Sequence, residues 1–193
     1  MNSEQAIKNY REKAKGREYI PGFFFNLMTL SMKIVDVLTN YSSKHFRTLK
    51  LNENQVVVDY GCGPARYIRA ASQAVGKNGK VYAVDIHPMA IRDVKRKIKK
   101  YDLKNVEALL ADGNSCPISD KTADVVYAID MFHMVNQPED LLKELHRIVK
   151  PEGKVIIEDG HQPREKTLDK IQKTGYFTIK EENKFHVVCF PND

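Results

Sequence analysis

Cysteines are few in this sequence, and long apolar runs are absent. The three cysteines, Cys62, Cys116 and Cys189, lie far apart with no C-x-x-C pair, which argues against a disulfide framework and a zinc site. No run reaches the roughly 18 apolar residues of a membrane span, and residues 1–17 are too polar for a signal peptide. We therefore expect a cytoplasmic protein with no membrane span and no bound metal.

The dinucleotide-binding fingerprint is incomplete. Three β-branched residues at 56–58 precede the pattern D-x-G-x-G-x-A, which predicts a buried strand that turns sharply into a helix. The fingerprint requires G-x-G-x-x-G, and Arg66 stands where its third glycine would be. Gly61 and Gly63 would let a ligand approach the backbone closely. Asp59 would repel a pyrophosphate, whereas it suits a cationic ligand such as an amine or a sulfonium.

Size and composition predict one soluble domain. A chain of 193 residues, 42% hydrophobic and 29% charged, can bury a substantial core and has no room for a second catalytic domain. The net charge is +6, with basic excess in residues 1–50 (nine Lys/Arg against four acids) and 92–100 (six against one). Basic faces attract nucleic acid or acidic substrates. Because residues 92–100 lack interleaved aromatic side chains, we favour a solvated helix face there.

The first 50 residues are predicted to be helical and to form a segment of their own. A polar helix over residues 3–15 is followed by a break at Gly16 and by an apolar helix over residues 23–40, which is hydrophobic on more than one side. Two interpretations stay open. The helix packs under a loop, or one face covers the core while residues 23–25 line an apolar substrate pocket.

From residue 55 onward, strands and helices alternate. This order predicts a parallel sheet covered on both faces. Strands are expected over residues 55–60, 80–85, 105–111, 123–129 and 154–159, and helices over residues 64–75, 88–101, 137–149 and 163–173. Two further strands, over residues 176–180 and 185–190, are joined by a short polar turn and predict a terminal hairpin.

The glycine turn and the terminal hairpin together resemble class I S-adenosylmethionine-dependent methyltransferases. The usual first motif of that family is an acid followed by x-G-x-G-x-G, and the chain departs from it only at Ala65. The resemblance covers about residues 51–193. It implies an α/β Rossmann-like fold, with a seven-stranded, mostly parallel sheet in the order 3-2-1-4-5-7-6, helices on both faces and a C-terminal antiparallel hairpin.

Two further stretches narrow the resemblance to a group within that family. The fourth strand ends in Asp130-Met131-Phe132, where enzymes that methylate adenine or glutamine amino groups carry Asn or Asp and two prolines. Residues 144–153, Glu-Leu-His-Arg-Ile-Val-Lys-Pro-Glu-Gly, are similar to the small-molecule group that includes the ubiquinone and menaquinone biosynthesis methyltransferases. The resemblance therefore implies a small-molecule acceptor.

Acids follow three consecutive predicted strands, and the carboxyl ends of parallel strands are where open α/β sheets bind ligands. The resemblance implies that Asp85 accepts both ribose hydroxyls, that Ile86 packs on the adenine and that Asp112 accepts from the adenine amino group. A solvent-facing acid at Asp85 and an ordinary Asp-Gly turn at Asp112 are the competing explanations. The full implied cofactor set is Asp59, Gly61, Cys62, Gly63, Asp85, Ile86, Asp112, Gly113, Ile129 and Asp130.

Methyl transfer from a sulfonium is a direct displacement, so alignment and exclusion of water are the main tasks of the protein. Where the acceptor must lose a proton, His133 or His161, each just past a strand end, could take it. Structural or exposed histidines are the competing explanation for both. The acceptor pocket is expected to come from the first 50 residues. Its candidate residues are Tyr10, Tyr19, Phe23 and Phe24, together with His133 and His161.

The first hypothesis is therefore an S-adenosylmethionine-dependent methyltransferase, a monomer or homodimer, that acts on an aromatic or apolar small molecule and releases S-adenosylhomocysteine. An RNA-directed methyltransferase or a basic RNA-binding module is the alternative. A nicotinamide-dependent oxidoreductase is disfavoured by the glycine spacing and the hairpin. A protein that keeps the cofactor site without acceptor chemistry also stays open.

Overall fold

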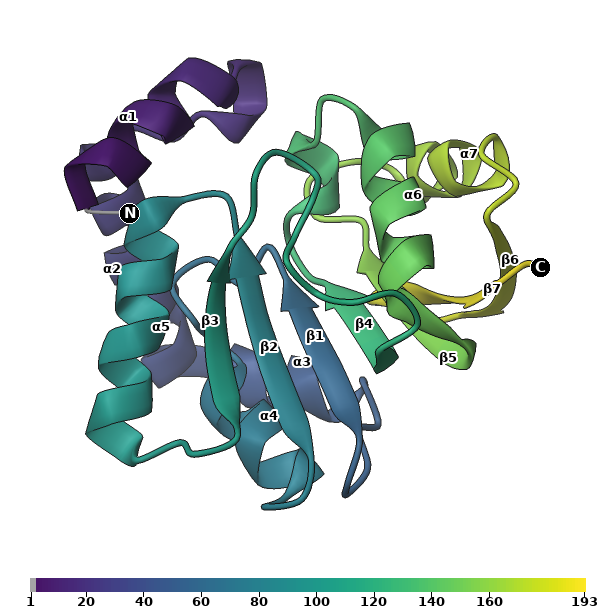
Figure 1. The fold of residues 1–193 in the computed structure, drawn as a ribbon, viewed down its shortest axis with the longest axis horizontal. Helices are drawn as coiled ribbons and strands as arrows, with labels where there is room; N and C mark the ends of the chain where they lie inside the picture. The colour runs from purple at the N-terminus through teal and green to yellow at the C-terminus, as the bar shows by residue number, and fades with distance from the viewer. Residues whose placement is uncertain (1–2) are drawn as a thin grey trace.

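Seven strands form one mixed sheet in the order β3-β2-β1-β4-β5-β7-β6 (Figure 1). The computed structural model describes residues 3–193, so residues 1–2 of the expected N-terminal segment lie outside it. The strands are β1 (Val56–Tyr60), β2 (Lys80–Asp85), β3 (Val106–Leu110), β4 (Ala123–Ala128), β5 (Val149–Glu158), β6 (Phe177–Glu182) and β7 (His186–Pro191). β1 to β5 pair in parallel, and β7 lies antiparallel between β5 and β6. The predicted fold class and strand order are confirmed.

Helices cover both faces of this sheet and bury two hydrophobic cores. The helices of the sheet domain are α4 (Ile68–Val75), α5 (Pro88–Tyr101), α6 (Pro138–Ile148) and α7 (Arg164–Gln172), with a short 3-10 helix, η2 (Phe132–Met134). One core contains apolar side chains of α6 and α7, and the other contains those of α4 and α5. Because β1 and β4 are covered on both sides, both of their faces are apolar, as in other parallel sheets.

Most element boundaries lie within two residues of the prediction, while two differ by four or five residues, each for a local cause. The first helix of the sheet domain was expected from residue 64, but α4 begins at Ile68, because the preceding turn includes Ala65 in a left-handed conformation (φ 59°). β5 begins at Val149, before the expected residue 154, because Val149 already pairs with Ala123 ahead of a register shift. Gly153 permits this pairing, since a β-carbon there would lie 2.9 Å from the Asp124 carbonyl oxygen.

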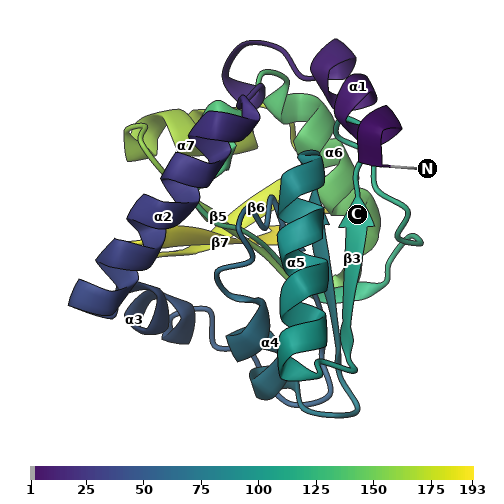
Figure 2. The ribbon, with the colours of Figure 1, turned by 90° about the vertical axis from the view of Figure 1, so that its left-hand side faces the viewer.

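An N-terminal layer of helices lies outside the sheet domain. It comprises α1 (Ser3–Lys13), the 3-10 helix η1 (Gly16–Glu18), α2 (Gly22–Thr39) and α3 (Tyr41–Arg47). α1 lies beyond the carboxyl ends of β2 and β3 (Figure 1), and α2 crosses the face that also carries α5 (Figure 2). By length and mean hydropathy (1.3), α2 is the one helix in the described chain that resembles a membrane span. It contains Lys33 and Asp36, however, and only Phe25 and Thr29 are buried in it.

Candidate active site

A cavity of about 970 Å³ opens at the carboxyl edge of the parallel strands. The turn after β1, the ends of β2 and β4 and the loop after β3 form one side of it. α1 and α2 form the other side, and α6 adds charged residues such as Lys143 and Arg147. All ten residues of the implied cofactor set line this cavity: Asp59, Gly61, Cys62, Gly63, Asp85, Ile86, Asp112, Gly113, Ile129 and Asp130. The expectation that acids from three strand ends meet at one edge therefore agrees with the geometry.

The glycine turn forms the floor of the cavity. The amides of Gly61 and Cys62 both donate to the Val84 carbonyl oxygen, at 2.8 and 3.0 Å, which fixes the turn against β2. Gly61 and Gly63 have φ values of 76° and 48°, a region that glycine enters without strain. A β-carbon on Gly61 would lie 2.7 Å from the Cγ atom of Met131, whereas one on Gly63 would meet no atom within 4 Å. The backbone at Gly63 is therefore open to a ligand.

Asp85 links this turn to the end of β2. Its Oδ2 atom accepts from the Gly63 amide at 2.8 Å, and its Oδ1 atom accepts from the His87 amide at 2.7 Å. Burial raises the pKa of Asp85 to about 6, against the opposing effect of these backbone hydrogen bonds. Each carboxylate oxygen can accept more than one hydrogen bond. Asp85 therefore holds the loop in place and keeps acceptor capacity for ligand hydroxyls.

Asp59 is the most deeply buried acid of the cavity wall, with 2% of its surface exposed. Burial raises its pKa to about 8. Within residues 3–193 its Oδ2 atom and the buried Tyr127 hydroxyl have no close hydrogen-bond partner, although the Tyr127 hydroxyl acts on Asp59 and lowers its pKa against the effect of burial. A buried carboxylate oxygen without a partner is costly, and a cationic ligand group would compensate that cost. The Asp59 carboxylate fits the ammonium group of a nucleoside that carries an amino acid. The open backbone at Gly63 leaves room for the same ligand to contact the main chain of the protein.

Asp112 differs from the other two acids because it is exposed. Its side chain forms an ion pair with Lys13 of α1 across the mouth of the cavity. Gly113 follows with φ 61°, which turns the backbone sharply there. A ligand that contacts Asp112 from the cavity would have to share this carboxylate with Lys13 or displace the lysine.

The expected acceptor residues divide between the cavity and the outer surface. Tyr10 lines the cavity, donates to the Glu18 carbonyl oxygen at 2.8 Å and accepts from the Ile20 amide at 2.7 Å. Tyr19 stacks on Tyr10 with ring centroids 5.6 Å apart, but it lies outside the cavity. Phe23 and Phe24 are 73% and 57% exposed on the outside of α2. The structure therefore does not bring these two phenylalanines to the cavity.

Phe25, Met28 and Met32 supply the cavity-facing side of α2 instead. Sequence reasoning named the phenylalanine cluster without deciding which face of the helix points inward. The spacing of residues 25, 28 and 32, three and four apart, places them on one side of a helix. Because residues 23, 27, 30 and 34 give an equally good apolar stripe, the pattern alone does not choose between the two faces.

Arg66 and His87 hold the N-terminal layer onto the glycine turn and β2, a role that the sequence did not indicate; His87, expected at the rim of the cofactor site, also lines the cavity. Arg66, directly after the turn, donates from Nε to the Asp36 carboxylate of α2 at 2.9 Å, and a second donor nitrogen lies 2.5 Å from the same group. The His87 ring contacts Phe25 at a centroid distance of 4.4 Å, and its Nε2 atom lies 3.0 Å from the Ile20 carbonyl oxygen. The acid at residue 36 and the arginine at residue 66 carried no pairing signal in the sequence.

The two candidate proton acceptors lie behind Asp130 and do not line the cavity. His161 is exposed, and its Nε2 atom is 3.9 Å from the Asp130 Oδ1 atom. His133 packs edge-on against His161, at a centroid distance of 4.9 Å, and burial lowers its pKa. One ligand atom from each of the three residues lies within 4.8 Å of the others. Around a single zinc-sized ion such atoms are about 3.4 Å apart, so the group would have to contract to hold one.

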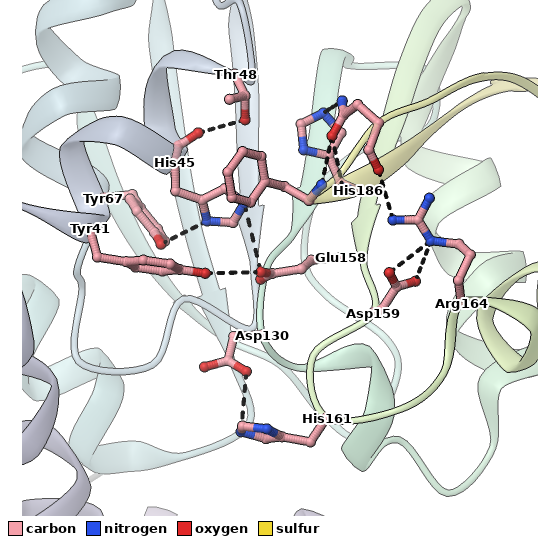
Figure 3. Close-up of polar contacts among 12 residues, drawn as sticks. Tyr41, His45, Thr48, Tyr67, Asp130, Glu158, Asp159, His161, Arg164 and His186 are labelled. Atoms are coloured by element: carbon pink, nitrogen blue, oxygen red, sulfur yellow. Dashed lines mark hydrogen bonds and ion pairs between the residues drawn. The ribbon is translucent and has the colours of Figure 1, made fainter.

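A second polar cluster lies at the end of β5 (Figure 3). The Glu158 Oε1 atom is 3.5 Å from the Tyr41 hydroxyl and 3.7 Å from the His45 Nε2 atom. Burial, reinforced by the nearby Asp130 carboxylate, raises the pKa of Glu158 to about 7. Burial lowers the pKa of His45. The cluster joins α3 to the sheet with groups that favour their neutral forms.

The open sheet, the glycine turn, the acids at successive strand ends and the closing hairpin define the class I methyltransferase fold. Comparison with known proteins agrees. A family model described as "Methyltransferase domain" matches residues 58–157, more than half of the chain. The chain therefore belongs to this family, within the class I S-adenosylmethionine-dependent methyltransferases. Membership in this family excludes the alternative of a nicotinamide-dependent oxidoreductase.

Individual relatives support the same assignment. The chain is 31% identical over 136 residues to the demethylmenaquinone methyltransferase of Geobacillus sp. (strain WCH70), and 34% identical over 119 residues to that of Bacillus mycoides (strain KBAB4). These matches cover 69% and 61% of the chain but 56% and 49% of the relatives, so the chain spans about half the length of the curated relatives it matches.

Solved structures extend the likeness over most of the chain. A S-adenosylmethionine-dependent methyltransferase from Aquifex aeolicus is 28% identical with a TM-score of 0.66, covering 78% of this chain and 88% of that one. A TehB-like methyltransferase from Corynebacterium glutamicum is 14% identical with a TM-score of 0.71, covering 89% of this chain and all of that one. At that identity, the second likeness supports the fold alone.

Proposed function

We propose that this protein binds S-adenosylmethionine at the carboxyl edge of its sheet and transfers the methyl group to a small aromatic or apolar acceptor. The observation that carries the proposal is the cavity. Its sheet side has buried carboxylates and open backbone, and its α2 side has Phe25, Met28 and Met32. We also propose that residues 51–193 hold the cofactor, while the segment up to residue 50 acts as a lid and faces the acceptor.

Each end of the cofactor has residues suited to hold it. Asp85 would accept from the ribose hydroxyls, because it keeps acceptor capacity beside the Gly63 amide. Asp59 would accept from the ammonium group, since its Oδ2 atom is buried without a partner in the described chain. Ile86 and Ile129 would pack on the adenine, and Asp112 would accept from the adenine amino group. The bound cofactor would supply an electrophilic methyl group on a sulfonium.

The acceptor side favours a flat, apolar molecule. Besides α2, the cavity is lined by Met131, Met134 and Val135 from the segment after β4. Methionine side chains adapt to irregular ring systems and contact aromatic faces favourably. The relatives named demethylmenaquinone methyltransferase support an aromatic acceptor.

Asp130 is the proposed first proton acceptor, with His161 as its outlet. Asp130 lines the cavity, and the exposed His161 ring lies 3.9 Å from its carboxylate on the outer side. A proton lost by an acceptor hydroxyl or activated carbon would pass to Asp130 and leave through His161. His133, whose pKa is lowered by burial, would hold the His161 ring in place and offer a second neutral nitrogen.

Calorimetry with S-adenosylhomocysteine, followed by an assay of its release from S-adenosylmethionine with phenols and hydroquinones, tests the proposal. We expect saturable binding and release that depends on an aromatic acceptor. A chain that binds no S-adenosylhomocysteine would contradict the proposal. Release with purified RNA but with no small molecule would favour the RNA-directed alternative, for which the cations of α5 are the supporting observation.

A further inference from the structure

The outer face of α2 is an exposed apolar surface. We define the α2 outer face by its exposed large hydrophobic residues, which include Val37 (86% exposed) and Leu38 (78%): Phe23, Phe24, Leu27, Leu30, Ile34, Val35, Val37 and Leu38. At 3.6 residues per turn, six of these positions lie on the side of the helix opposite Phe25, Met28 and Met32, while Phe24 and Val35 border that inner face beside Met28. Soluble monomers rarely expose contiguous apolar patches larger than a few hundred Å². A face of this kind therefore indicates a binding surface.

The same helix connects that face to the cavity. Phe25, Met28 and Met32 line the cavity from the inner side of α2, so an apolar path runs around one helix from the surface to the candidate site. Asp36 is held inward by Arg66 and leaves the outer face uncharged at that position. A helix that only covered a pocket would need apolar residues on one face. α2 has them on both.

Cations flank the α2 outer face. Lys33 is exposed on α2 itself, and α5, which lies beside α2 (Figure 2), exposes Arg92, Lys95, Arg96 and Lys99. The two helices are close, because Lys33 acts electrostatically on Lys97 and because a β-carbon on Gly22 would lie 3.0 Å from the Met89 sulfur atom. An apolar face bordered by lysine and arginine is the pattern of helices that lie in the interface of anionic bilayers.

We infer that α2 docks this protein onto an anionic lipid bilayer, with its outer face in the headgroup and upper acyl region and the cations of α5 on the lipid phosphates. The docking is argued only from the α2 outer face and the cations beside it. Its purpose would be to let an acceptor dissolved in the bilayer enter the cavity along α2, and this purpose rests on the proposed function. A second copy of the chain fits less well, because a symmetric dimer through α2 would bring two sets of cations into one interface. A span is disfavoured because the inner face of α2 covers the cavity.

Sedimentation with vesicles tests the docking. We expect the protein to pellet with vesicles of phosphatidylcholine and phosphatidylglycerol, and much less with phosphatidylcholine alone. The triple variant Leu30→Gln, Val37→Gln, Leu38→Gln should bind these vesicles at least tenfold more weakly, because each substitution removes an apolar side chain that would be buried in the bilayer. The double variant Lys95→Gln, Lys99→Gln should lose about fivefold in affinity per cation removed. Ile7→Gln, which removes an exposed apolar residue of α1, outside α2 and α5, is the matched control and should bind like wild type.

A fluorescent probe gives a second measurement. The three native cysteines are buried, so Val37→Cys can be labelled selectively with a polarity-sensitive dye. Its emission should shift to the blue with anionic vesicles. Failure of the wild-type chain to bind, or equal binding of the triple variant, would overturn the inference, as would a concentration-dependent dimer that the triple variant abolishes. Retained binding of S-adenosylhomocysteine shows that the variants fold, and it separates failure of the docking from failure of the proposed function.

Discussion

The two sides of the cavity are built in different ways. The sheet side, which we propose as the cofactor side, consists of turns between buried strands, whose polar groups are fixed by hydrogen bonds such as those from the Gly61 and Gly63 amides. The helical side, which we propose as the acceptor side, exposes much of its apolar surface and attaches through a few side-chain contacts, among them Arg66 with Asp36. We therefore expect the first side to be as stable as the sheet and the second to open locally without unfolding it.

This difference has a chemical counterpart. Asp59 and Asp85 on the cofactor side are buried, and burial raises the pKa of both carboxyls. Lys13 and Asp112, which join α1 to the loop after β3, form an ion pair in water. Buried carboxylates recognise a ligand strongly because their desolvation cost is met only when a partner arrives. An exposed pair exchanges partners at little cost. The cofactor side is therefore built for affinity and the acceptor side for access.

Asp85→Ala should have the largest effect. It removes the proposed acceptor of the ribose hydroxyls and frees the Gly63 and His87 amides, so the affinity for S-adenosylhomocysteine should fall at least 100-fold, given about 1.5–3 kcal/mol for each hydrogen bond to a charged group. Calorimetry measures the loss. The affinity of Asp85→Asn, which keeps one acceptor oxygen, should fall less. The variant Asp169→Ala, at an exposed position, should bind S-adenosylhomocysteine with normal affinity. Equal affinity in all three variants would contradict the assigned role of Asp85.

Asp59 should give binding a pH dependence. Its pKa of about 8 means that the free protein holds a proton there at neutral pH, and the ammonium of the cofactor would expel it. The affinity should therefore rise with pH, by up to about tenfold per unit below pH 8. Calorimetry in buffers of different ionisation enthalpy should detect proton release. Asp59→Asn should bind more weakly and release no proton, and buffer-independent heats in wild type would contradict this account.

The sequence contained most of what determines the cofactor side. The strand at residues 56–60 and the acids Asp59, Asp85 and Asp112 are local signals, and the rule that parallel strands present their carboxyl ends at one edge assembles them without further information. β2 and α5 matched their predicted ranges for the same reason. The start of α4 did not, because the left-handed Ala65 depends on how the turn packs and not on helix propensity.

The acceptor side could not be derived in the same way. The inward face of α2 is decided by tertiary contacts, such as that of Phe25 with His87, and both faces of the helix are equally apolar in the sequence. Arg66 was noticed only as a missing glycine, although the structure pairs it with Asp36, thirty residues earlier. Charge pairs at such separations leave no periodic signal. Membership in the family narrows the chemistry to methyl transfer, while it does not fix which face of α2 points inward.

Glu158→Gln should change the pH dependence of stability. The Glu158 carboxyl has a pKa of about 7 in the native state and an ordinary value of 4.5, so between these values the native state holds a proton that the unfolded chain releases. Wild type should therefore lose stability as pH rises through this window, by about 3 kcal/mol. Glutamine does not titrate, so the variant should not lose this stability. Between pH 4.5 and pH 8 its free energy of unfolding should therefore rise by that amount relative to wild type.

Urea unfolding of both proteins across this pH range measures the difference. The titrations of His45 and of the remaining groups largely cancel in the comparison, since both proteins contain them. The exposed Glu152→Gln is the matched control, because it leaves the buried cluster intact. Parallel pH curves for wild type and Glu158→Gln would show that the cluster in Figure 3 does not favour a neutral carboxyl.

The smallest expected effect concerns the attachment of α2. Arg66→Ala removes a partly buried ion pair, with side chains 13% and 27% exposed, that joins α2 to the residue following the glycine turn. The amides of α2 should lose protection from hydrogen exchange by roughly tenfold, which corresponds to about 1.4 kcal/mol, while those of β1 and β4 should keep theirs. Hydrogen exchange followed by mass spectrometry resolves the two regions. Arg69→Ala, an exposed arginine on α4, serves as the control.

Asp36→Asn should reproduce this loss, and the double variant should lose no more than either single one, because both changes break the same contact. If the two effects add, Arg66 and Asp36 stabilise α2 through different neighbours. A loss of protection that extended into β1 would show that the N-terminal layer and the sheet unfold together. The contrast between a fixed cofactor side and a separately opening acceptor side would then have to be given up.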